Sequence, residues 1–256
     1  MYDNLKFMNN KKVVIVTGGS RGIGYGITKA FIDNNYIVVV GSRQDRDLSK
    51  QFGDNVRFIY TDVRYEKYHL NLVETTIHEF GRLDCFINNA GYSKWKPIEE
   101  INEEFLTDII DTNLKGAFWG SKIASKYLNK EGTIINVSSL AGKRGSSNNS
   151  AYVASKFGMN GLTQSLSKEL GPKGIRVNAV CPVLINTEGL NEALMDKSSP
   201  GNGDPKKFIN EFTRLNSPLL RMPTSLEVGK TCVFLASESA SAITGELLSI
   251  RASFKP

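Results

Sequence analysis

Short apolar runs and longer amphipathic stretches alternate along the first 180 residues of the chain. The short runs are rich in β-branched residues, which is typical of strands buried on both faces of a parallel sheet. The longer stretches carry apolar residues at helical spacing. The pattern predicts strands at 13–16, 36–40, 56–60, 85–87, 133–137 and 176–180, and helices at 23–34, 48–52, 66–80, 103–128 and 152–170.

This alternation predicts an α/β fold, a Rossmann-like doubly wound parallel sheet with helices on both faces. A helix at 226–236 and a last strand near 246–250 bring the sheet to seven strands. The chain has no linker or repeat, so we expect one domain over residues 1–256. Ligands of such folds bind at the carboxyl ends of the strands, which makes the residues after each strand the informative ones.

The helical and strand patterns both break down between residues 186 and 218, where glycines, prolines and polar residues dominate. A long irregular segment in a compact domain usually has a function. We therefore expect a substrate lid at about 188–216.

A glycine-rich turn, Thr-Gly-Gly-Ser-Arg-Gly-Ile-Gly, separates the first predicted strand from the first predicted helix. Its glycines let the backbone approach a pyrophosphate, and the helix N-terminus behind it offers free N–H groups. The turn therefore predicts dinucleotide binding. The expected contacts are Thr17, Gly18, Ser20, Arg21, Gly22, Ile23 and Gly24.

The end of the second predicted strand distinguishes between the two nicotinamide cofactors. An NAD enzyme places an acid there for the ribose 2′-hydroxyl, but this strand ends in Gly41-Ser42-Arg43. An arginine can bind the 2′-phosphate of NADP instead. Ser42 and Arg43, together with Arg21, favour NADP(H) over NAD(H).

Tyr152 and Lys156 lie four residues apart in a predicted helix, so their side chains share one face. A nearby ammonium stabilises a phenolate, which predicts a lowered pKa for Tyr152 and a role as acid/base. Ser139 follows the strand at 133–137 and can stabilise negative charge on a substrate oxygen. Its neighbour Ser138 is better suited to capping the strand end.

The glycine spacing and the Tyr-x-x-x-Lys motif together resemble the short-chain dehydrogenases/reductases, in their single-domain branch of about this length. The resemblance adds Asn113 as the fourth catalytic residue, supporting a water in a proton relay to Lys156. It implies that Tyr152 and Lys156 also bind the nicotinamide ribose. Further cofactor contacts implied by the resemblance are Asp62, Val63, Asn89, Ala90 and Gly91. The implied reaction is hydride transfer between NADP(H) and a carbonyl or alcohol, with no metal.

The chain departs from the family pattern after the sixth strand and at its C-terminus. Pro182 and Thr187 are kept as expected contacts of the nicotinamide, but Val183 replaces a glycine. We expect the backbone there to take a different path. The residues after 245 lack the Asp-Gly-Gly that is common in the family. In the family this region helps to form a subunit contact. The resemblance therefore implies a homotetramer or homodimer, with a different contact at this region.

Composition excludes several other classes of protein. The net charge is +6, but the basic residues are scattered, so we expect no nucleic-acid partner. With no apolar run of transmembrane length and no leader pattern in residues 1–12, we expect a cytoplasmic protein that has no membrane partner. Cys85, Cys181 and Cys232 are expected to be reduced and buried, while His69 and His78 lie away from every motif.

The substrate is expected to be a small carbonyl or alcohol compound. The predicted pocket wall comprises residues 92–95, 140–144 and the lid, and Lys94, Lys96, Lys143 and Arg144 give it a basic rim. A basic rim would suit an acidic or phosphate-bearing substrate, and solvated rim lysines explain it equally well. Residues around 183–189 resemble short-chain enzymes of bacterial sugar and flagellin-glycosylation pathways. The alternatives are a 3-oxoacyl-[acyl-carrier-protein] reductase and a non-catalytic NADP(H)-binding sensor.

Overall fold

The structure, a computed structural model, describes residues 11–252. Seven strands form one parallel sheet in the order β3-β2-β1-β4-β5-β6-β7, which confirms the predicted doubly wound sheet. The strands are β1 (Val13–Thr17), β2 (Ile37–Ser42), β3 (Val56–Tyr60), β4 (Cys85–Asn88), β5 (Thr133–Val137), β6 (Arg176–Pro182) and β7 (Leu247–Ile250). Residues 1–10 and 253–256 lie outside the described residues. The first of these ranges holds most of the stretch in which a leader pattern was sought.

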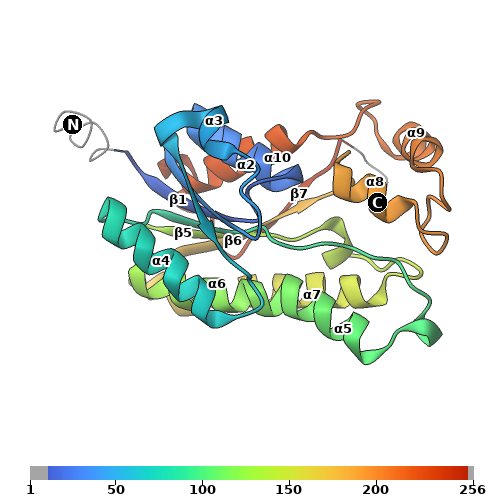
Figure 1. The fold of residues 1–256 in the computed structure, drawn as a ribbon, viewed down its shortest axis with the longest axis horizontal. Helices are drawn as coiled ribbons and strands as arrows, with labels where there is room; N and C mark the ends of the chain where they lie inside the picture. Colours follow the sequence, from blue (N-terminus) through green and yellow to red (C-terminus); the bar gives the residue numbers. More distant parts are fainter. Residues whose placement is uncertain (1–10, 253–256) are drawn as a thin grey trace.

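Helices cover both faces of the sheet. Figure 1 shows α2, α3 and α10 above it and α4, α6 and α7 below it. The helices are α2 (Gly22–Asp33), α3 (Leu48–Phe52), α4 (Glu66–Phe80), α5 (Glu103–Ile110), α6 (Gly116–Tyr127), α7 (Ser150–Leu170), α8 (Glu188–Leu194), α9 (Pro205–Asn216) and α10 (Ser225–Ala236).

The core consists of two apolar layers, one on each face of the sheet. Val14 and Val16 of β1 pack toward α2 and α10, whereas Val13 and Ile15 of the same strand pack toward α4 and α6. Successive side chains of a strand point to opposite faces, so a strand covered on both sides must be apolar throughout. This explains why the runs of apolar residues, rather than an alternation with polar residues, identified the strands.

The segment predicted as one helix over 103–128 is interrupted in its middle. Residues 111–115 form a π-helical turn between α5 and α6. Such turns are rare and frequently occur at functional sites. The side chain of Asn113 lies within this turn and is fully buried.

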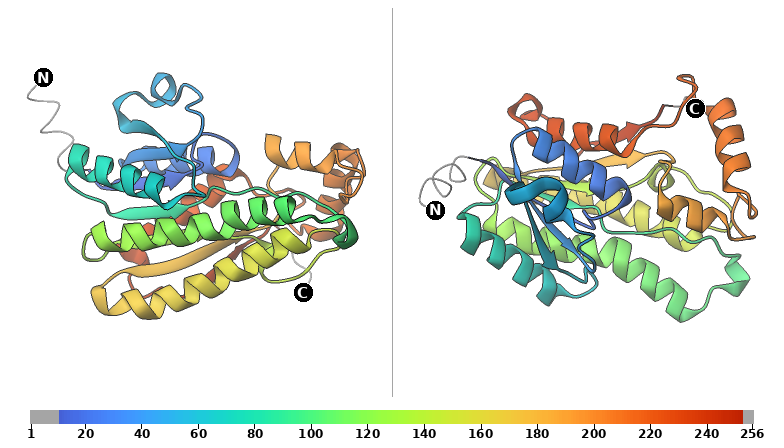
Figure 2. Two further views of the ribbon diagram at one scale, coloured as in Figure 1. Left: turned by 60° about the horizontal axis from the view of Figure 1, so that its bottom comes forward. Right: turned by 45° about the horizontal axis from the view of Figure 1, so that its top comes forward.

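The segment expected to be irregular contains two helices, so that part of the prediction is wrong. Thr187 caps α8 by accepting a hydrogen bond from the Leu190 N–H at 3.2 Å. Asp204 caps α9 in the same way, and Pro205 occupies its first position. These are ordinary helix-start signals, which the surrounding glycines and prolines obscured. Both helices lie with α5 at one end of the molecule (Figures 1 and 2).

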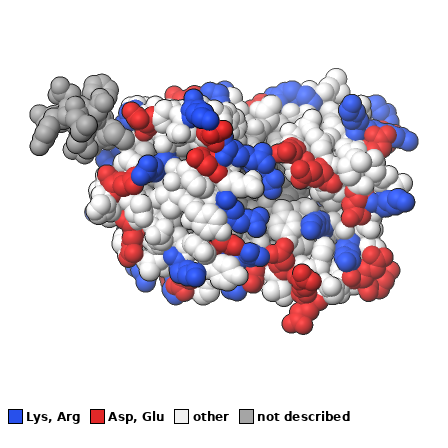
Figure 3. Space-filling model, in the orientation of Figure 1, with Lys and Arg blue, Asp and Glu red and all other residues white. Residues whose placement is uncertain are grey.

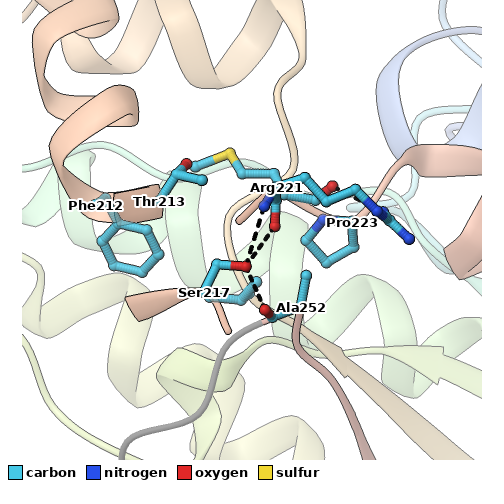
Figure 4. A pocket seen from close by; sticks show the side chains of 8 residues that line it. Phe212, Thr213, Ser217, Arg221, Pro223 and Ala252 are labelled. Carbon is cyan, nitrogen blue, oxygen red and sulfur yellow. Dashed lines mark hydrogen bonds between the residues drawn. The ribbon is translucent and has the colours of Figure 1, made fainter. Parts of the chain in front are cut away.

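The segment that follows α9 is tied to the C-terminal strand. The Ser217 hydroxyl lies between the carbonyl oxygens of Arg221 and Ala252, beyond the end of β7 (Figure 4). The Leu219 N–H also donates to the Ala252 carbonyl at 3.3 Å. The chain is therefore anchored between α9 and α10.

The remaining composition-based expectations can be compared with the structure. The three cysteines are buried and free, as predicted. Lys and Arg side chains are interspersed with Asp and Glu on the face drawn in Figure 3. Within residues 11–252, every helix is too short or too polar to cross a membrane.

Candidate active site

The glycine turn joins β1 directly to α2. Gly18 and Gly22 have φ of +64° and +56°, a left-handed conformation that disfavours side chains. A Cβ added at Gly24 would lie 2.1 Å from the Gly18 carbonyl oxygen, so the first turn of α2 packs against the glycine turn itself. Only glycines allow the turn to close so tightly.

The end of β4 holds the glycine turn in place. The Asn89 side chain donates to the carbonyl oxygens of Thr17 and Gly18 at 2.9 and 3.1 Å. The Thr17 hydroxyl accepts from the N–H groups of Asn89 and Ala90 and donates to the Ile87 carbonyl. Thr17 and Asn89 therefore brace the turn, and the Thr17 hydroxyl and the Asn89 amide nitrogen are engaged within the protein.

The end of β2 reaches the same edge of the sheet. The hydroxyls of Ser20 and Ser42 lie 3.1 Å apart, which joins the glycine turn to this strand. Arg21 and Arg43 are both exposed, and neither forms an ion pair with a described residue. The nearest acid along the chain, Asp45, is engaged in accepting from the Leu48 N–H at the start of α3.

Asp62 and Val63 follow β3 at the predicted position. Arg64 donates to the Asp62 carboxylate, with a shortest distance of 2.6 Å, and this hydrogen bond is the main reason that the pKa of Asp62 is lowered. The charge of Arg43 also lowers the pKa of Asp62, by a smaller amount.

His69 lies closer to the predicted cofactor contacts than the sequence indicated. It is fully buried, and its Nε2 lies 2.9 Å from the Val63 carbonyl oxygen. Burial lowers its pKa, so the neutral ring that donates to this carbonyl is favoured. The prediction that both histidines lie away from every motif is wrong for His69, whereas His78 is on the surface.

Ser139 and Tyr152 meet beyond the end of β5. The Ser139 hydroxyl accepts from the Ala141 N–H at 3.1 Å, and its hydrogen bond with Tyr152 lowers the pKa of the phenol. Burial has the larger effect, however, and the pKa of Tyr152 is raised overall. The sequence predicted the opposite direction. Ser138 is buried and points instead to the Lys156 carbonyl, as expected for a structural residue.

The position of Lys156 explains this difference. Its ammonium donates to the Val137 carbonyl at 2.8 Å and lies 5.7 Å from the centre of the Tyr152 ring. It therefore faces the ring without binding the phenol oxygen. Lys156 is 4% exposed, and burial lowers its pKa to about 8.

Asn113 contacts Tyr92 and lies close to Gly91. Its side chain exchanges hydrogen bonds with the N–H and carbonyl of Tyr92 at 3.0 and 2.9 Å. A Cβ added at Gly91 would lie 2.9 Å from the Asn113 Oδ1 and 3.7 Å from the Lys156 Nζ. The side chains of Asn113 and Lys156 therefore converge on the backbone at Gly91.

Ser155 is a residue of the site that the sequence analysis missed. Its hydroxyl accepts from the Asn113 side chain at 3.2 Å and donates to the Tyr152 carbonyl at 2.7 Å. It thus connects the π-helical turn to the helix that carries the tyrosine. Its position three residues after Tyr152, on the same side of a helix, was the available signal.

The segment after β6 places Thr187 beside the glycine turn. A Cβ added at Gly22 would lie 3.7 Å from the Thr187 methyl carbon. The strand β6 ends at Pro182, and the Val183 N–H still donates to the Ile250 carbonyl at 3.0 Å. Val183 therefore prolongs the pairing with β7 by one bond.

Two of the segments assigned to the substrate pocket from the sequence, the loop at 92–95 and residues 188–216, are connected through Asn148 and Asn149, which lay outside the predicted wall. The Ser93 hydroxyl donates to the Asn149 side chain at 3.2 Å, and the Lys96 N–H donates to the Asn148 carbonyl at 2.6 Å. The Asn148 side chain donates in turn to the Ser198 carbonyl of the lid segment at 3.1 Å. Asn149 accepts from the Val153 N–H, one turn from Tyr152.

The basic rim is not a uniform cationic surface. The Lys143 ammonium donates to the Leu247 carbonyl and the Ser249 hydroxyl on β7. Lys94 and Lys96 line a groove of about 520 Å³ whose walls also carry three acids, Glu104, Asp108 and Asp111. These contacts favour solvated or internally paired lysines over a site for an acidic substrate.

The residues present fit a dinucleotide. The N-terminus of α2 has no side-chain cap, so the N–H groups of its first turn can bind a phosphate. Gly18 and Gly22 bring the backbone to the same place. The residues that would hold a nicotinamide nucleotide therefore surround one edge of the sheet, next to Tyr152.

Comparisons with known proteins agree with this geometry. Residues 12–198 match the family model described as short chain dehydrogenase. The 3-oxoacyl-[acyl-carrier-protein] reductase of Chlamydia muridarum is 35% identical over 93% of this chain and 95% of its own length. The L-fucose dehydrogenase of Bos taurus is 38% identical over 93% of this chain and 87% of its own length.

Solved structures show the same likeness. The aldohexose dehydrogenase of Thermoplasma acidophilum superimposes with a TM-score of 0.87 at 33% identity, covering 95% of this chain and 93% of its own. An actinorhodin polyketide ketoreductase with NADPH gives 0.88 at 28% identity, covering 95% and 97%. With its seven-stranded parallel sheet and the match over most of its length, this chain belongs to the short-chain dehydrogenase/reductase family of oxidoreductases.

Proposed function

We propose that this protein is an NADP(H)-dependent oxidoreductase that interconverts a carbonyl and an alcohol, with Tyr152 as the acid/base. The observation that carries the proposal is the convergence of Ser139, Tyr152, Lys156 and Asn113 at the carboxyl ends of β4 and β5. The Ser139 side chain lowers the pKa of the Tyr152 phenol, the Lys156 ammonium faces the same ring, and Asn113 lies beside Lys156 across Gly91.

Each residue has a separate task in the reduction. The Ser139 hydroxyl polarises the substrate oxygen, and Tyr152 donates its phenolic proton to that oxygen as the carbonyl becomes an alcohol. Lys156 stabilises the resulting phenolate through its charge, and Asn113 supports the return of a proton from solvent. A bound nicotinamide would supply or accept the hydride.

The preference for NADP(H) over NAD(H) rests on charge at the end of β2. Arg43 and Arg21 are exposed cations, and Ser42 stands where an acid would bind a 2′-hydroxyl. Asp45 is the acid nearest to Arg43 along the chain. Its carboxylate accepts a hydrogen bond from the Leu48 N–H at the start of α3. An NADPH-bound relative has the same fold as this chain.

For the substrate we propose a sugar-derived carbonyl or alcohol. Asn149 lies at the start of α7, three residues before Tyr152, and its side chain accepts a hydrogen bond from the Ser93 hydroxyl at 3.2 Å. Hydroxyl and amide side chains suit a ligand with many hydroxyls. The L-fucose and aldohexose dehydrogenases are relatives with sugar substrates.

The alternative is a reductase of 3-oxoacyl carrier-protein thioesters. It is favoured by the 35% identity to such an enzyme over nearly the full length of both chains. The catalytic residues are the same in both proposals, so only the pocket wall distinguishes them.

A panel of substrates with each nucleotide tests the proposal. Hydride transfer is followed by nicotinamide absorbance, with NADP⁺ and NAD⁺ against aldoses and with NADPH and NADH against a 3-oxoacyl thioester. We expect aldose oxidation with NADP⁺ preferred. Thioester reduction alone would select the alternative, and nucleotide binding without turnover would favour the sensor.

A further inference from the structure

One ion pair joins two segments that lie 142 residues apart in the chain. The Arg46 guanidinium and the Glu188 carboxylate approach to 3.0 Å. Arg46 lies in the loop between β2 and α3, and Glu188 is the first residue of α8. The pair therefore bridges the two ends of the proposed cofactor site.

The bridge passes beside the glycine turn. Arg46 follows Ser42, which contacts the turn through Ser20. Glu188 follows Thr187, whose methyl group lies next to Gly22. The loop after β2, the glycine turn and the start of α8 are thus in contact one after another, and the Arg46–Glu188 pair closes the ring.

The loop that presents Arg46 is held in an unusual conformation. Arg46 and Asp47 have φ of 57° and 56°, in the left-handed region that costs free energy for side chains other than glycine. The Arg46 carbonyl accepts from the Gln51 side chain at 3.1 Å, and Gln51 accepts from the Tyr25 hydroxyl of α2 at 2.9 Å. Contacts with α2 therefore fix the backbone from which the guanidinium reaches Glu188.

We propose that the Arg46–Glu188 pair is a clasp that holds the start of α8 over the cofactor turn and must open before a nucleotide leaves. This inference rests on the proposed function, which places a dinucleotide at the turn. Arg46 and Glu188 act as positioning residues, through Thr187 and α8. The pair does not need the 2′-phosphate, so the clasp retains NADPH and NADH alike.

Nucleotide release measures the clasp directly. NADPH or NADH is bound to the protein, and its dissociation is followed by stopped-flow fluorescence of the reduced nicotinamide. The pair is partly exposed, 39% and 57% for the two side chains, so we expect Arg46→Gln and Glu188→Gln each to speed release about two- to fivefold. The double variant should release no faster than the single ones, and the exchange Arg46→Glu with Glu188→Arg should restore slow release.

A matched control is the exposed pair of Arg57 and Glu79, which joins β3 to α4 away from the turn. Arg57→Gln should leave both release rates unchanged. Faster release of NADPH alone in Arg46→Gln, with Glu188→Gln unchanged, would make Arg46 a phosphate ligand and overturn the clasp. Unchanged release in both variants would overturn the clasp alone, whereas a wild-type protein that binds neither nucleotide would overturn the proposed function and the clasp with it.

Discussion

At the scale of single residues, burial controls the proton chemistry of the site. The same desolvation raises the pKa of Tyr152 and lowers that of Lys156, because it disfavours the charged form of each. A phenol that holds its proton is suited to act as an acid in carbonyl reduction. A negative group beside a lysine with a pKa of about 8 raises that pKa and so favours the protonated ammonium form.

The lowered pKa of Lys156 predicts a pH dependence of stability. Between about pH 8 and pH 10 the unfolded chain binds a proton at this residue that the folded chain has lost. The free energy of unfolding therefore rises with pH in this window, and below it the contribution is absent. Relative to Lys156→Met, the wild type should gain about 2 kcal/mol between pH 8 and pH 10, measured by urea unfolding. Parallel pH profiles for the two proteins would show that burial does not shift this lysine.

Arg43 carries the proposed discrimination between nucleotides. Arg43→Gln removes a charged donor from the end of β2, and we expect NADPH binding to weaken about tenfold or more while NADH binding is unchanged. Calorimetric titration of both nucleotides measures this. Lys50→Gln, a charge change in the adjacent helix α3, is the control and should affect neither. Equal weakening for both nucleotides would contradict a role for Arg43 at the 2′-phosphate.

At the scale of elements, the sequence predicted helices and strands well where the pattern was long or uniformly apolar. The helix over 66–80 and the strands over 56–60 and 133–137 have the predicted bounds. The helices α8 and α9 escaped prediction because few of their side chains are buried: Leu194 alone in α8 and none in α9. Without a buried stripe, helical periodicity is weak, and only the capping residues remain as a signal.

The π-helical turn at 111–115 also lies beyond what a pattern can show. One extra residue rotates the apolar stripe of the following segment by about 100° but leaves the helical spacing within each flanking segment intact. Its effect is local, since it places the fully buried Asn113 side chain against Tyr92 and Ser155. The proposed role of Asn113 in a proton relay rests on a resemblance, whereas its contacts with Tyr92 and Ser155 are visible only in the structure.

The close contact between α2 and α10 predicts that one added methyl group at Gly229 lowers the stability of the protein. A Cβ added at Gly229 would lie 2.5 Å from the Gly26 carbonyl oxygen, so Gly229→Ala forces the two helices apart. We expect the free energy of unfolding to fall by about 1–3 kcal/mol. Gly171→Ala is the matched control, because Gly171 has helical φ and nothing lies within 4 Å of the added Cβ. Equal thermal stability of the two variants would show that the helix pair is not closely packed there.

At the scale of the whole molecule, the alternation of strands and helices was sufficient to predict the sheet and the edge at which the site lies. The parallel order follows from short connections and from the handedness of the crossovers. Contacts between distant segments could not be predicted, because charge and polarity along the chain do not specify a partner. The pairing of Arg46 with Glu188 and the engagement of Lys143 by β7 are examples.

The proposed function depends above all on Tyr152 as the residue that provides the proton in hydride transfer. The most direct measurement compares wild type and Tyr152→Phe for NADPH-dependent turnover and, on the same samples, for NADPH binding. The variant keeps the ring and loses the hydroxyl, so we predict unchanged binding and turnover slowed at least about a hundredfold. Turnover at the wild-type rate in Tyr152→Phe would contradict the account.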